Sequence, residues 1–212
     1  MYYPVNLDIK GKRCLVVGGG EVAYQKVKGL LRAGAKVTVV APRLVARLSA
    51  MKRSGKIQWL ARSFQKKILR GYFLAIVATD DREVNSEIGR LCREKNILVN
   101  VVDQPVDCSF TVPSLLRRGS LMIAISTNGA SPALSKAIRK DLESRYGADF
   151  GEFLSLMGSL RQEAIERIPE QPLRKRRFEK VIASEVLSLI RQGEHRRARK
   201  RVRQILFGEK VS

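Results

Sequence analysis

Histidine and cysteine are scarce in this chain of 212 residues. It has one histidine, His195, and three cysteines at wide spacings, Cys14, Cys92 and Cys108, with no Cys-x-x-Cys pair. This set excludes a disulfide framework and a structural zinc site, so no metal site is predicted. Cys14 lies in an apolar run and Cys92 on the apolar side of a predicted helix, which predicts buried thiols in a reducing compartment.

Long apolar runs are also missing. Hydrophobic residues make up 44% of the chain, but no uncharged, apolar run approaches the about 20 residues that a membrane helix needs. Nothing resembles a cleavable secretion signal. We therefore expect a cytoplasmic protein with no membrane partner.

Acidic residues are outnumbered by basic ones. The chain has 20 Asp and Glu against 41 Lys and Arg, which gives a formal charge of +21. Such a field concentrates polyanions around a molecule, and both nucleic acids and small polycarboxylates meet that description. The arginine-rich stretch 193–203 is open to two interpretations, a frayed, solvated helix or a contact for a polyanion.

Strand-like runs alternate with helical periodicity from Lys12 onward. The first run is followed by the turn Gly18-Gly19-Gly20 and by a helix that Gly34 ends. Continuous apolar runs of this kind are typical of parallel strands covered on both faces, so the sequence predicts an α/β fold with a Rossmann-type parallel sheet. The predicted strands are residues 13–17, 36–40, 57–60, 73–78 and 97–102.

The pattern changes after residue 112. A lone strand is predicted at 121–126, and Ser131-Pro132 is a good start for a helix, with serine as the cap and proline in the first turn. Helical periodicity then continues to the end of the chain. We predict three parts: a nucleotide-binding domain (1–112), a small central segment (113–150) and a C-terminal helical module with a basic tail (151–212).

The glycine turn has the form Gly-x-Gly-x-x-Ala at the junction of a strand and a helix. In this context Gly18 permits the tight turn, Gly20 lets the backbone approach a pyrophosphate, and Ala23 lets the helix lie against the strand. The helix N-terminus offers free N–H groups to the phosphates. The sequence therefore predicts a dinucleotide site here.

The acidic residue that often follows the second strand in such sites is missing. Val40 is followed by Ala41-Pro42-Arg43. Pro42 and Arg43 are expected to border the adenosine, and the residues alone leave NAD and NADP both open, since Arg43 suits a 2′-phosphate.

Polar residues follow the fourth and fifth predicted strands, at the sheet edge where ligands of open α/β sheets bind. Thr79 is expected to border the cofactor, whereas Asp80 and Asp81 are expected to cap the next helix. Asp103 is expected near the nicotinamide. The following segment offers Ser109, Phe110, Pro113 and Ser114 to shape a substrate pocket.

Taken together, the motifs resemble those of the precorrin-2 dehydrogenase and sirohydrochlorin ferrochelatase family, and of the N-terminal half of fused siroheme synthases. The resemblance covers roughly residues 2–190. Its motifs are Gly-Gly-Gly-Glu-Val-Ala, Ala-Thr-Asp-Asp, Asn-Val-Val-Asp, Ser109-Phe110 with Pro113-Ser114, and Thr127-Asn128-Gly129-Ala130-Ser131-Pro132.

This resemblance implies a function: oxidation of precorrin-2 to sirohydrochlorin with NAD. It implies that Asp103 is the catalytic residue, that Glu21, Val22, Pro42 and Arg43 contact the nucleotide, and that the protein is a homodimer built on its central and C-terminal segments. Substrate binding is assigned to Ser109, Phe110, Ser114, Thr127 and Asn128. The acetate and propionate groups of the tetrapyrrole give the +21 charge a purpose without nucleic acid.

The resemblance does not decide whether the protein also inserts iron into sirohydrochlorin. If it does, ferrous iron is a second substrate. The methyltransferase part of the fused enzymes has no counterpart here, so we expect this chain not to make its own precorrin-2. The rival interpretation is a non-enzymatic NAD sensor that reports to a partner or a polyanion through its basic helical tail.

Overall fold

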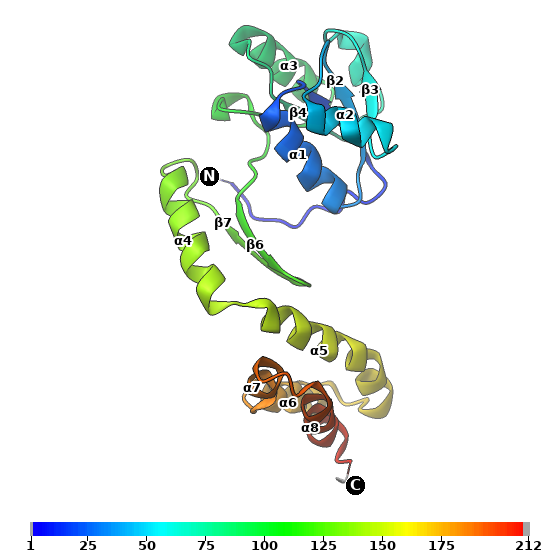
Figure 1. Cartoon of the computed structure of the whole chain (residues 1–212), viewed down its shortest axis with the longest axis vertical. Helices are drawn as coiled ribbons and strands as arrows, with labels where there is room; N and C mark the ends of the chain where they lie inside the picture. Colours follow the sequence, from blue (N-terminus) through cyan, green and yellow to red (C-terminus); the bar gives the residue numbers. More distant parts are fainter. Residues whose placement is uncertain (1, 210–212) are drawn as a thin grey trace. The chain divides into compact units, whose positions relative to one another are not determined.

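The computed structural model describes residues 2–209, and the chain divides after Val112 into two compact units (Figure 1). The first unit holds the parallel sheet, and the second holds a β-hairpin followed by helices. The finer division of the second unit at residue 150 stays a prediction.

The sheet of the first unit is five-stranded and parallel, with the order β3-β2-β1-β4-β5. This confirms the predicted Rossmann-type architecture, with strand ends that differ from prediction by at most one residue. The strands are β1 (Arg13–Val17), β2 (Lys36–Val40), β3 (Gln58–Leu60), β4 (Leu74–Val77) and β5 (Leu98–Val101).

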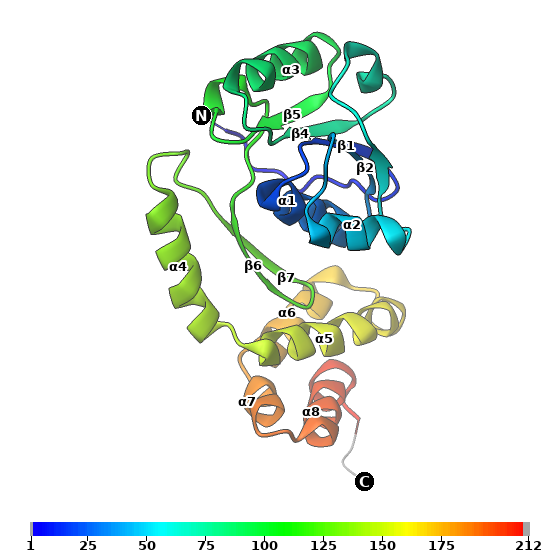
Figure 2. The same ribbon diagram turned by 45° about the horizontal axis from the view of Figure 1, so that its top comes forward.

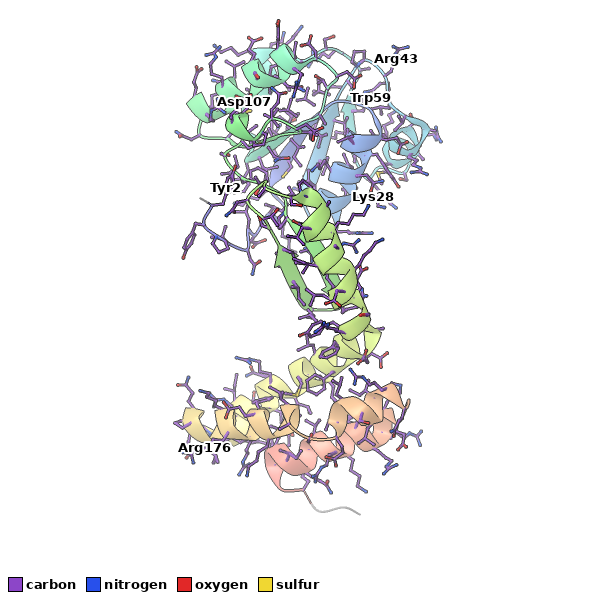
Figure 3. The ribbon with its side chains drawn as sticks, turned by 90° about the vertical axis from the view of Figure 1, so that its left-hand side faces the viewer. Tyr2, Lys28, Arg43, Trp59, Asp107 and Arg176 are labelled. Carbon is purple, nitrogen blue, oxygen red and sulfur yellow. The ribbon has the colours of Figure 1, made fainter. Side chains whose placement is uncertain are left out.

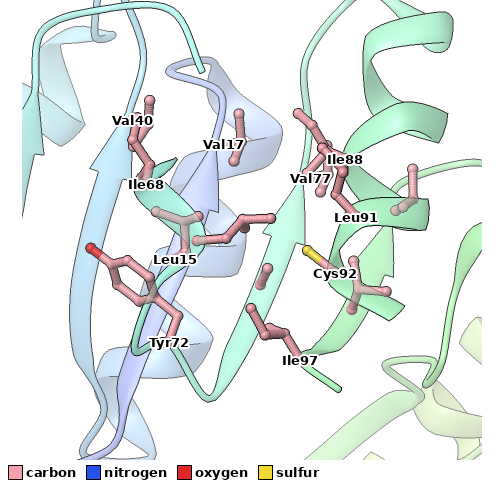
Figure 4. Close-up of a cluster of buried hydrophobic side chains, with 14 residues drawn as sticks. Leu15, Val17, Val40, Ile68, Tyr72, Val77, Ile88, Leu91, Cys92 and Ile97 are labelled. Carbon is pink, nitrogen blue, oxygen red and sulfur yellow. The ribbon is translucent and has the colours of Figure 1, made fainter. Parts of the chain in front are cut away.

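Helices cover both faces of this sheet, as Figure 2 shows. On one face α1 (Glu21–Arg32) and α2 (Ala46–Arg53) pack against one set of strand side chains. On the other, α3 (Arg82–Glu94) and the short 3-10 helix η1 (Lys66–Leu69) enclose a second cluster, drawn in Figure 4. Side chains alternate along β1, so that Leu15 and Val17 enter the second cluster and Cys14 and Val16 enter the first.

The two cysteines expected in the core are buried there. Cys14 and Cys92 are free thiols with no exposed surface. Burial raises the pKa of each thiol to about 11, which keeps both protonated and unreactive near neutral pH. Their role in this unit is therefore packing.

The second unit begins with an antiparallel hairpin, which corrects the expectation of a lone strand. β6 (Ser114–Arg118) pairs with β7 (Leu121–Ile125) through the two-residue connection Gly119-Ser120, in which Gly119 has a φ of +55°. The Ser-Leu-Leu-Arg-Arg sequence of β6 has no β-branched residue, so its strand propensity is low. The Gly-Ser pair is the turn signal that identifies the hairpin.

Five helices follow the hairpin up to residue 209. Ser131 caps the first of them as predicted, with its Oγ accepting a hydrogen bond from the Leu134 N–H at 3.2 Å. The helices are α4 (Pro132–Arg145), α5 (Ala148–Arg167), α6 (Gln171–Ile182), α7 (Val186–Arg191) and α8 (His195–Phe207). No helix within residues 2–209 is long and apolar enough to cross a membrane.

The arginine-rich stretch lies in the packed helix α8, which corrects its interpretation as a frayed helix, whereas Arg196, Arg197 and Arg199 are exposed, as expected of a solvated one. Ala198 and Val202 are fully buried against α5, α6 and α7. Arg203 lies between two carboxylates, donating to Glu163 at 2.8 Å and to Glu209 at 2.7 Å. These ion pairs join α5, α8 and the segment after α8.

The same ion pairs lower the pKa values of the two carboxylates. Hydrogen bonds from Arg203 and then from Arg167 lower the pKa of Glu209 to about 2 and lower the pKa of Glu163 as well. Both carboxylates are therefore ionised in the folded chain at pH values where the unfolded chain has begun to take up protons.

We expect the variant Arg203→Met to lose less stability in acid than the wild type does. A carboxylate whose pKa is lowered on folding stabilises the fold at pH values above its ordinary pKa of 4.5. This contribution is lost as the pH falls towards about 2, the pKa of Glu209 in the folded chain. Thermal unfolding followed by circular dichroism should give Arg203→Met a lower midpoint at neutral pH and a shallower decline below pH 4.5.

The control is Arg145→Met, which breaks an exposed pair with Asp141 of 3.1 Å on α4. Exposed pairs contribute little, so its midpoint should follow the wild type. Equal acid sensitivity of Arg203→Met and the wild type would show that the cluster around Arg203 does not stabilise the second unit.

Candidate functional site

The turn between β1 and α1 admits only glycine at two positions. Gly18 has a φ of +124°, and a Cβ atom there would lie 2.1 Å from the carbonyl oxygen of Ala78. At Gly19 a Cβ atom would lie 1.9 Å from the carbonyl oxygen of Arg43. The turn therefore passes tightly between the ends of β4 and β2. The motif alone did not show that position 19 must also be glycine.

Gly20 stands in open space instead. A Cβ atom at this position would meet nothing within 4 Å, and no side chain caps α1, whose N-cap is Gly20. Free N–H groups at a helix N-terminus with room before them suit a phosphate group. Ala23, one turn on, is fully buried against the sheet, so its small side chain lets α1 lie close to the strands.

A cavity of about 920 Å³ opens beside this turn. It lies at the carboxyl ends of the parallel strands, where a Rossmann-type sheet binds its nucleotide. The cavity brings together most of the predicted cofactor and catalytic residues, namely Gly18, Gly20, Glu21, Val22, Pro42, Arg43, Thr79 and Asp103.

The loop after β2 forms one wall of the cavity. Pro42 and Arg43 are exposed there, near Trp59 of β3, whose indole N–H donates to the Ala41 carbonyl oxygen at 2.9 Å (Figure 3). The N–H of Val45 donates to the Gly19 carbonyl oxygen at 2.9 Å, which fastens this loop to the glycine turn. The wall is therefore held through its backbone by one side-chain and one backbone donor, and the Arg43 side chain is left exposed.

The segment after β4 is a closed hydrogen-bonded network. The Thr79 hydroxyl donates to Asn85 Oδ1 at 2.6 Å, and Asn85 Nδ2 returns a bond to the Thr79 carbonyl oxygen at 3.0 Å. Of the two predicted caps, Asp81 caps α3 by accepting from the N–H groups of Glu83 and Val84, whereas Asp80 is not the cap. Asn85 is buried and lines the cavity, and sequence reasoning missed it because it stands inside a helix.

Asp103 follows β5 in an unusual backbone conformation. Its φ is +59°, in the left-handed region that aspartate tolerates better than most residues. The side chain is exposed at the cavity, and its carboxylate has no hydrogen-bond partner among residues 2–209. The carboxylate is therefore free to meet a ligand.

Lys26 is a charged neighbour of Asp103 that the sequence did not reveal. It stands one helical turn after Val22, which lines the cavity, and it is half-buried. Burial lowers the pKa of the Lys26 ammonium, and the nearby Asp103 and Cys108 oppose that shift. The carboxylate that follows β5 thus acts electrostatically on an ammonium group of α1.

Ser109 and Phe110 are not among the described residues that line the cavity. The Ser109 Oγ accepts from the Val99 N–H at 2.7 Å, so this hydroxyl is engaged with β5. Phe110 is half-buried against the α1 side of the sheet, and its carbonyl oxygen accepts from Asn100 Nδ2 at 3.1 Å. Their assignment to substrate binding stays a prediction.

Three further predicted substrate residues gather at one end of the hairpin in the second unit. Ser114 begins β6 opposite Ile125, and Thr127 and Asn128 follow β7 at the same end. The Thr127 hydroxyl accepts from the Ser131 N–H at 3.1 Å and lies 3.2 Å from the buried Ser135 hydroxyl. Asn128 is exposed, with a φ of +51°.

Metal ligands do not gather in the described part of the chain. Within residues 2–209, no group of three or more His, Cys, Asp or Glu side chains is placed to hold a metal ion.

Comparison with known protein families matches nearly the whole chain. Residues 5–114 match the family described as "Putative NAD(P)-binding". Residues 118–145 match "Sirohaem biosynthesis protein central", and residues 149–206 match "Sirohaem synthase dimerisation region". The first unit is therefore an NAD(P)-binding domain.

Curated relatives give the same result. Siroheme synthase 1 of Pectobacterium atrosepticum is 38% identical over 208 residues, and siroheme synthase of Thioalkalivibrio sulfidiphilus is 39% identical over 205 residues. These alignments cover 98% and 97% of this chain but only 43% and 42% of the relatives. The chain thus spans less than half the length of the curated relatives it matches.

A solved structure matches over its full length. The protein described as "SirC, precorrin-2 dehydrogenase" is 31% identical with a TM-score of 0.78, and the match covers 94% of this chain and all of that one. The resemblance found in the sequence is confirmed, and the chain belongs to the siroheme-biosynthesis family of precorrin-2 dehydrogenases and siroheme synthases.

Proposed function

We propose that this protein oxidises precorrin-2 to sirohydrochlorin with NAD. The observation that carries the proposal is the cavity of the first unit, where the exposed Asp103 carboxylate and the glycine turn border one space. The full-length match to a precorrin-2 dehydrogenase supports the choice of reaction. The rival interpretation as a regulatory NAD sensor finds no support among the similar proteins.

The cofactor proposal rests on the fit of the cavity to a dinucleotide. The open space before Gly20 and the uncapped N-terminus of α1 would hold the pyrophosphate. Pro42 and Arg43 would border the adenosine beyond β2, which leaves the β5 end for the nicotinamide. On the family resemblance we propose that the cofactor is NAD. Measuring the affinity of the same protein for NAD and for NADP tests this choice.

Asp103 is the proposed base. When bound, the nicotinamide supplies a hydride acceptor, and oxidation of the substrate then also releases a proton. The Asp103 carboxylate has open hydrogen-bonding capacity at the cavity and accepts that proton in the proposal. Lys26 of α1 is a charged neighbour of this carboxylate.

The proposed substrate also accounts for the charge of the chain. Precorrin-2 carries several carboxylates around its rim, and a basic surface raises the local concentration of such a molecule. The three free thiols fit the proposed location in the cytoplasm.

A homodimer is the proposed assembly. The match to a sirohaem synthase dimerisation region supports it, as do exposed apolar side chains in the second unit. The register places Leu115 beside Ala124 and Arg117 beside Met122 on one exposed face of the hairpin. Leu134 and Ile138 are likewise exposed on α4. A second copy of the chain is the proposed cover for these side chains.

Replacing Gly20 with valine should abolish dinucleotide binding in a folded protein. The valine side chain meets no protein atom near its Cβ but occupies the space assigned to the pyrophosphate. Binding is measured by isothermal titration with NAD and folding by circular dichroism. In contrast, Gly18→Val should lower the unfolding midpoint, because its Cβ collides with the Ala78 carbonyl oxygen. Tight binding of NAD to folded Gly20→Val would refute the site.

The variant Asp103→Asn should bind NAD and keep its fold but lose turnover. Asparagine tolerates the left-handed backbone of this position, so the substitution removes the base without straining the turn. General bases contribute about a hundredfold to ten-thousandfold in rate, and an anaerobic assay that follows NADH formation from precorrin-2 measures the loss. Siroheme formation from sirohydrochlorin and ferrous iron, assayed in the same variant, tests whether iron insertion uses this residue. Normal dehydrogenase turnover in Asp103→Asn would contradict the proposal.

Charges placed on the exposed face of the hairpin should separate the dimer. The double variant Leu115→Glu and Met122→Glu sets two carboxylates on that face, and sedimentation velocity should then give the mass of one chain. Val106→Glu, at a position 89% exposed in the first unit, is the matched control and should leave the mass unchanged. A dimer of unchanged stability in the double variant would show that the hairpin face is not the interface.

A further inference from the structure

The first unit has a second cavity, of about 820 Å³, to which the proposed function assigns nothing. Its lining comes from η1 and from the turns that precede β4 and β5. Because the strands are parallel, these turns lie at the edge of the sheet opposite to the glycine turn. Figure 4 shows Tyr72 and Ile97, which line this cavity, towards the other end of the strands from Val17 and Val40, which line the nucleotide cavity.

Four exposed cations line this second cavity, Lys66, Lys67, Arg70 and Lys95, and we call it the basic cavity. The two lysines of η1, the arginine before β4 and the lysine before β5 approach it from three segments of the chain. Within residues 2–209, no Asp or Glu lines the basic cavity, and none forms an ion pair with these four side chains. Glu94, which precedes Lys95, is engaged in an ion pair within α3.

A fifth cation, Arg13, lies beside the basic cavity. Arg13 begins β1, the neighbour of β4, and its guanidinium lies over the ring of Tyr72, 4.6 Å from the centroid. A Cβ atom at Gly71, which also lines the cavity, would lie 3.0 Å from Arg13 Nη1. The aromatic ring thus holds the guanidinium beside the cavity without neutralising its charge.

This arrangement of charge suits a small ligand with several negative groups. Like charges that gather without carboxylates repel one another, and an anion that enters the group relieves the repulsion. A concave site lets cations from several segments reach one compact molecule. The apolar side chains of the lining, Leu69, Tyr72 and Ile97, are buried, so charge is what the basic cavity offers to a ligand.

We propose that the basic cavity binds a small polyanion, a compact molecule that carries at least two phosphate or carboxylate groups. The exposed side chains of Lys66, Lys67, Arg70 and Lys95 neutralise these groups. The two cavities of the first unit share no lining residue, so the polyanion leaves the nucleotide cavity open. This site is independent of the proposed dehydrogenase activity.

The test uses two probes, inorganic tripolyphosphate for phosphate groups and citrate for carboxylates. Isothermal titration of the full chain, with NAD in excess, should show that at least one of them binds. The double variant Lys66→Gln and Lys95→Gln removes two of the four lining charges and should weaken this binding roughly tenfold. The probe that binds identifies the anionic group. Binding of neither probe to the wild type would overturn the proposal.

The matched control is the double variant Lys36→Gln and Lys56→Gln. It removes two exposed lysines from the same edge of the sheet, at the starts of β2 and β3, which lie two and three strands away from β4. At an ionic strength of about 0.15 M, charges farther than roughly 8 Å away are screened, so the control should bind the probe as the wild type does. Circular dichroism verifies that both double variants are folded.

Two further results would overturn the proposal. Equal weakening in the two double variants is expected if the whole edge attracts anions, as it would for an extended polyanion such as RNA. Unchanged binding in Lys66→Gln and Lys95→Gln would mean that the probe binds elsewhere, for example beside Gly20. Both double variants can be compared whether or not NAD binds, so failure of the proposed function leaves this test intact.

Discussion

The close passage of the first glycine turn between two carbonyl oxygens is the constraint on which the site depends. Side chains are excluded at Gly18 by Ala78 and at Gly19 by Arg43, so the turn lies level with the ends of β4 and β2. That position aims the N-terminus of α1 at the cavity and brings Lys26, a turn and a half along the helix, into the field of Asp103. Cofactor site and candidate base are thus aligned by one steric fit.

Polar groups around the cavity divide into two kinds. The hydroxyl of Thr79 and the amide of Asn85 bond to each other, and Asp81 bonds to the first turn of α3, so these side chains shape the backbone. The Asp103 carboxylate has no such partner among the described residues and is exposed at the cavity. A low-dielectric wall of satisfied groups with a few open ones is what lets a site select its ligand by hydrogen bonding.

The parts of the fold and of the candidate site that depend on local sequence could be predicted. The parallel sheet, the glycine turn and the Ser131 cap each follow from residues close in sequence, and they were predicted correctly. Asn85 lines the cavity from α3 and Lys26 lies near Asp103 from α1; both placements depend on how the helices pack, so no short motif predicts them. β6 was missed because its leucines and arginines have weak strand propensity and are held in the strand by pairing with β7.

The left-handed backbone at Asp103 has a consequence for how this family can diverge. Few side chains other than aspartate, asparagine and glycine accept a φ of +59° at little cost, so the fold restricts this position, and the proposed role as a base restricts it further. A lineage that no longer needs the proposed base is released from that restriction but not from the conformational one. Its descendants should drift to asparagine or glycine at this position and should avoid β-branched residues. The residue found at this position would then separate relatives that keep the proposed base from relatives that have lost it and kept the fold.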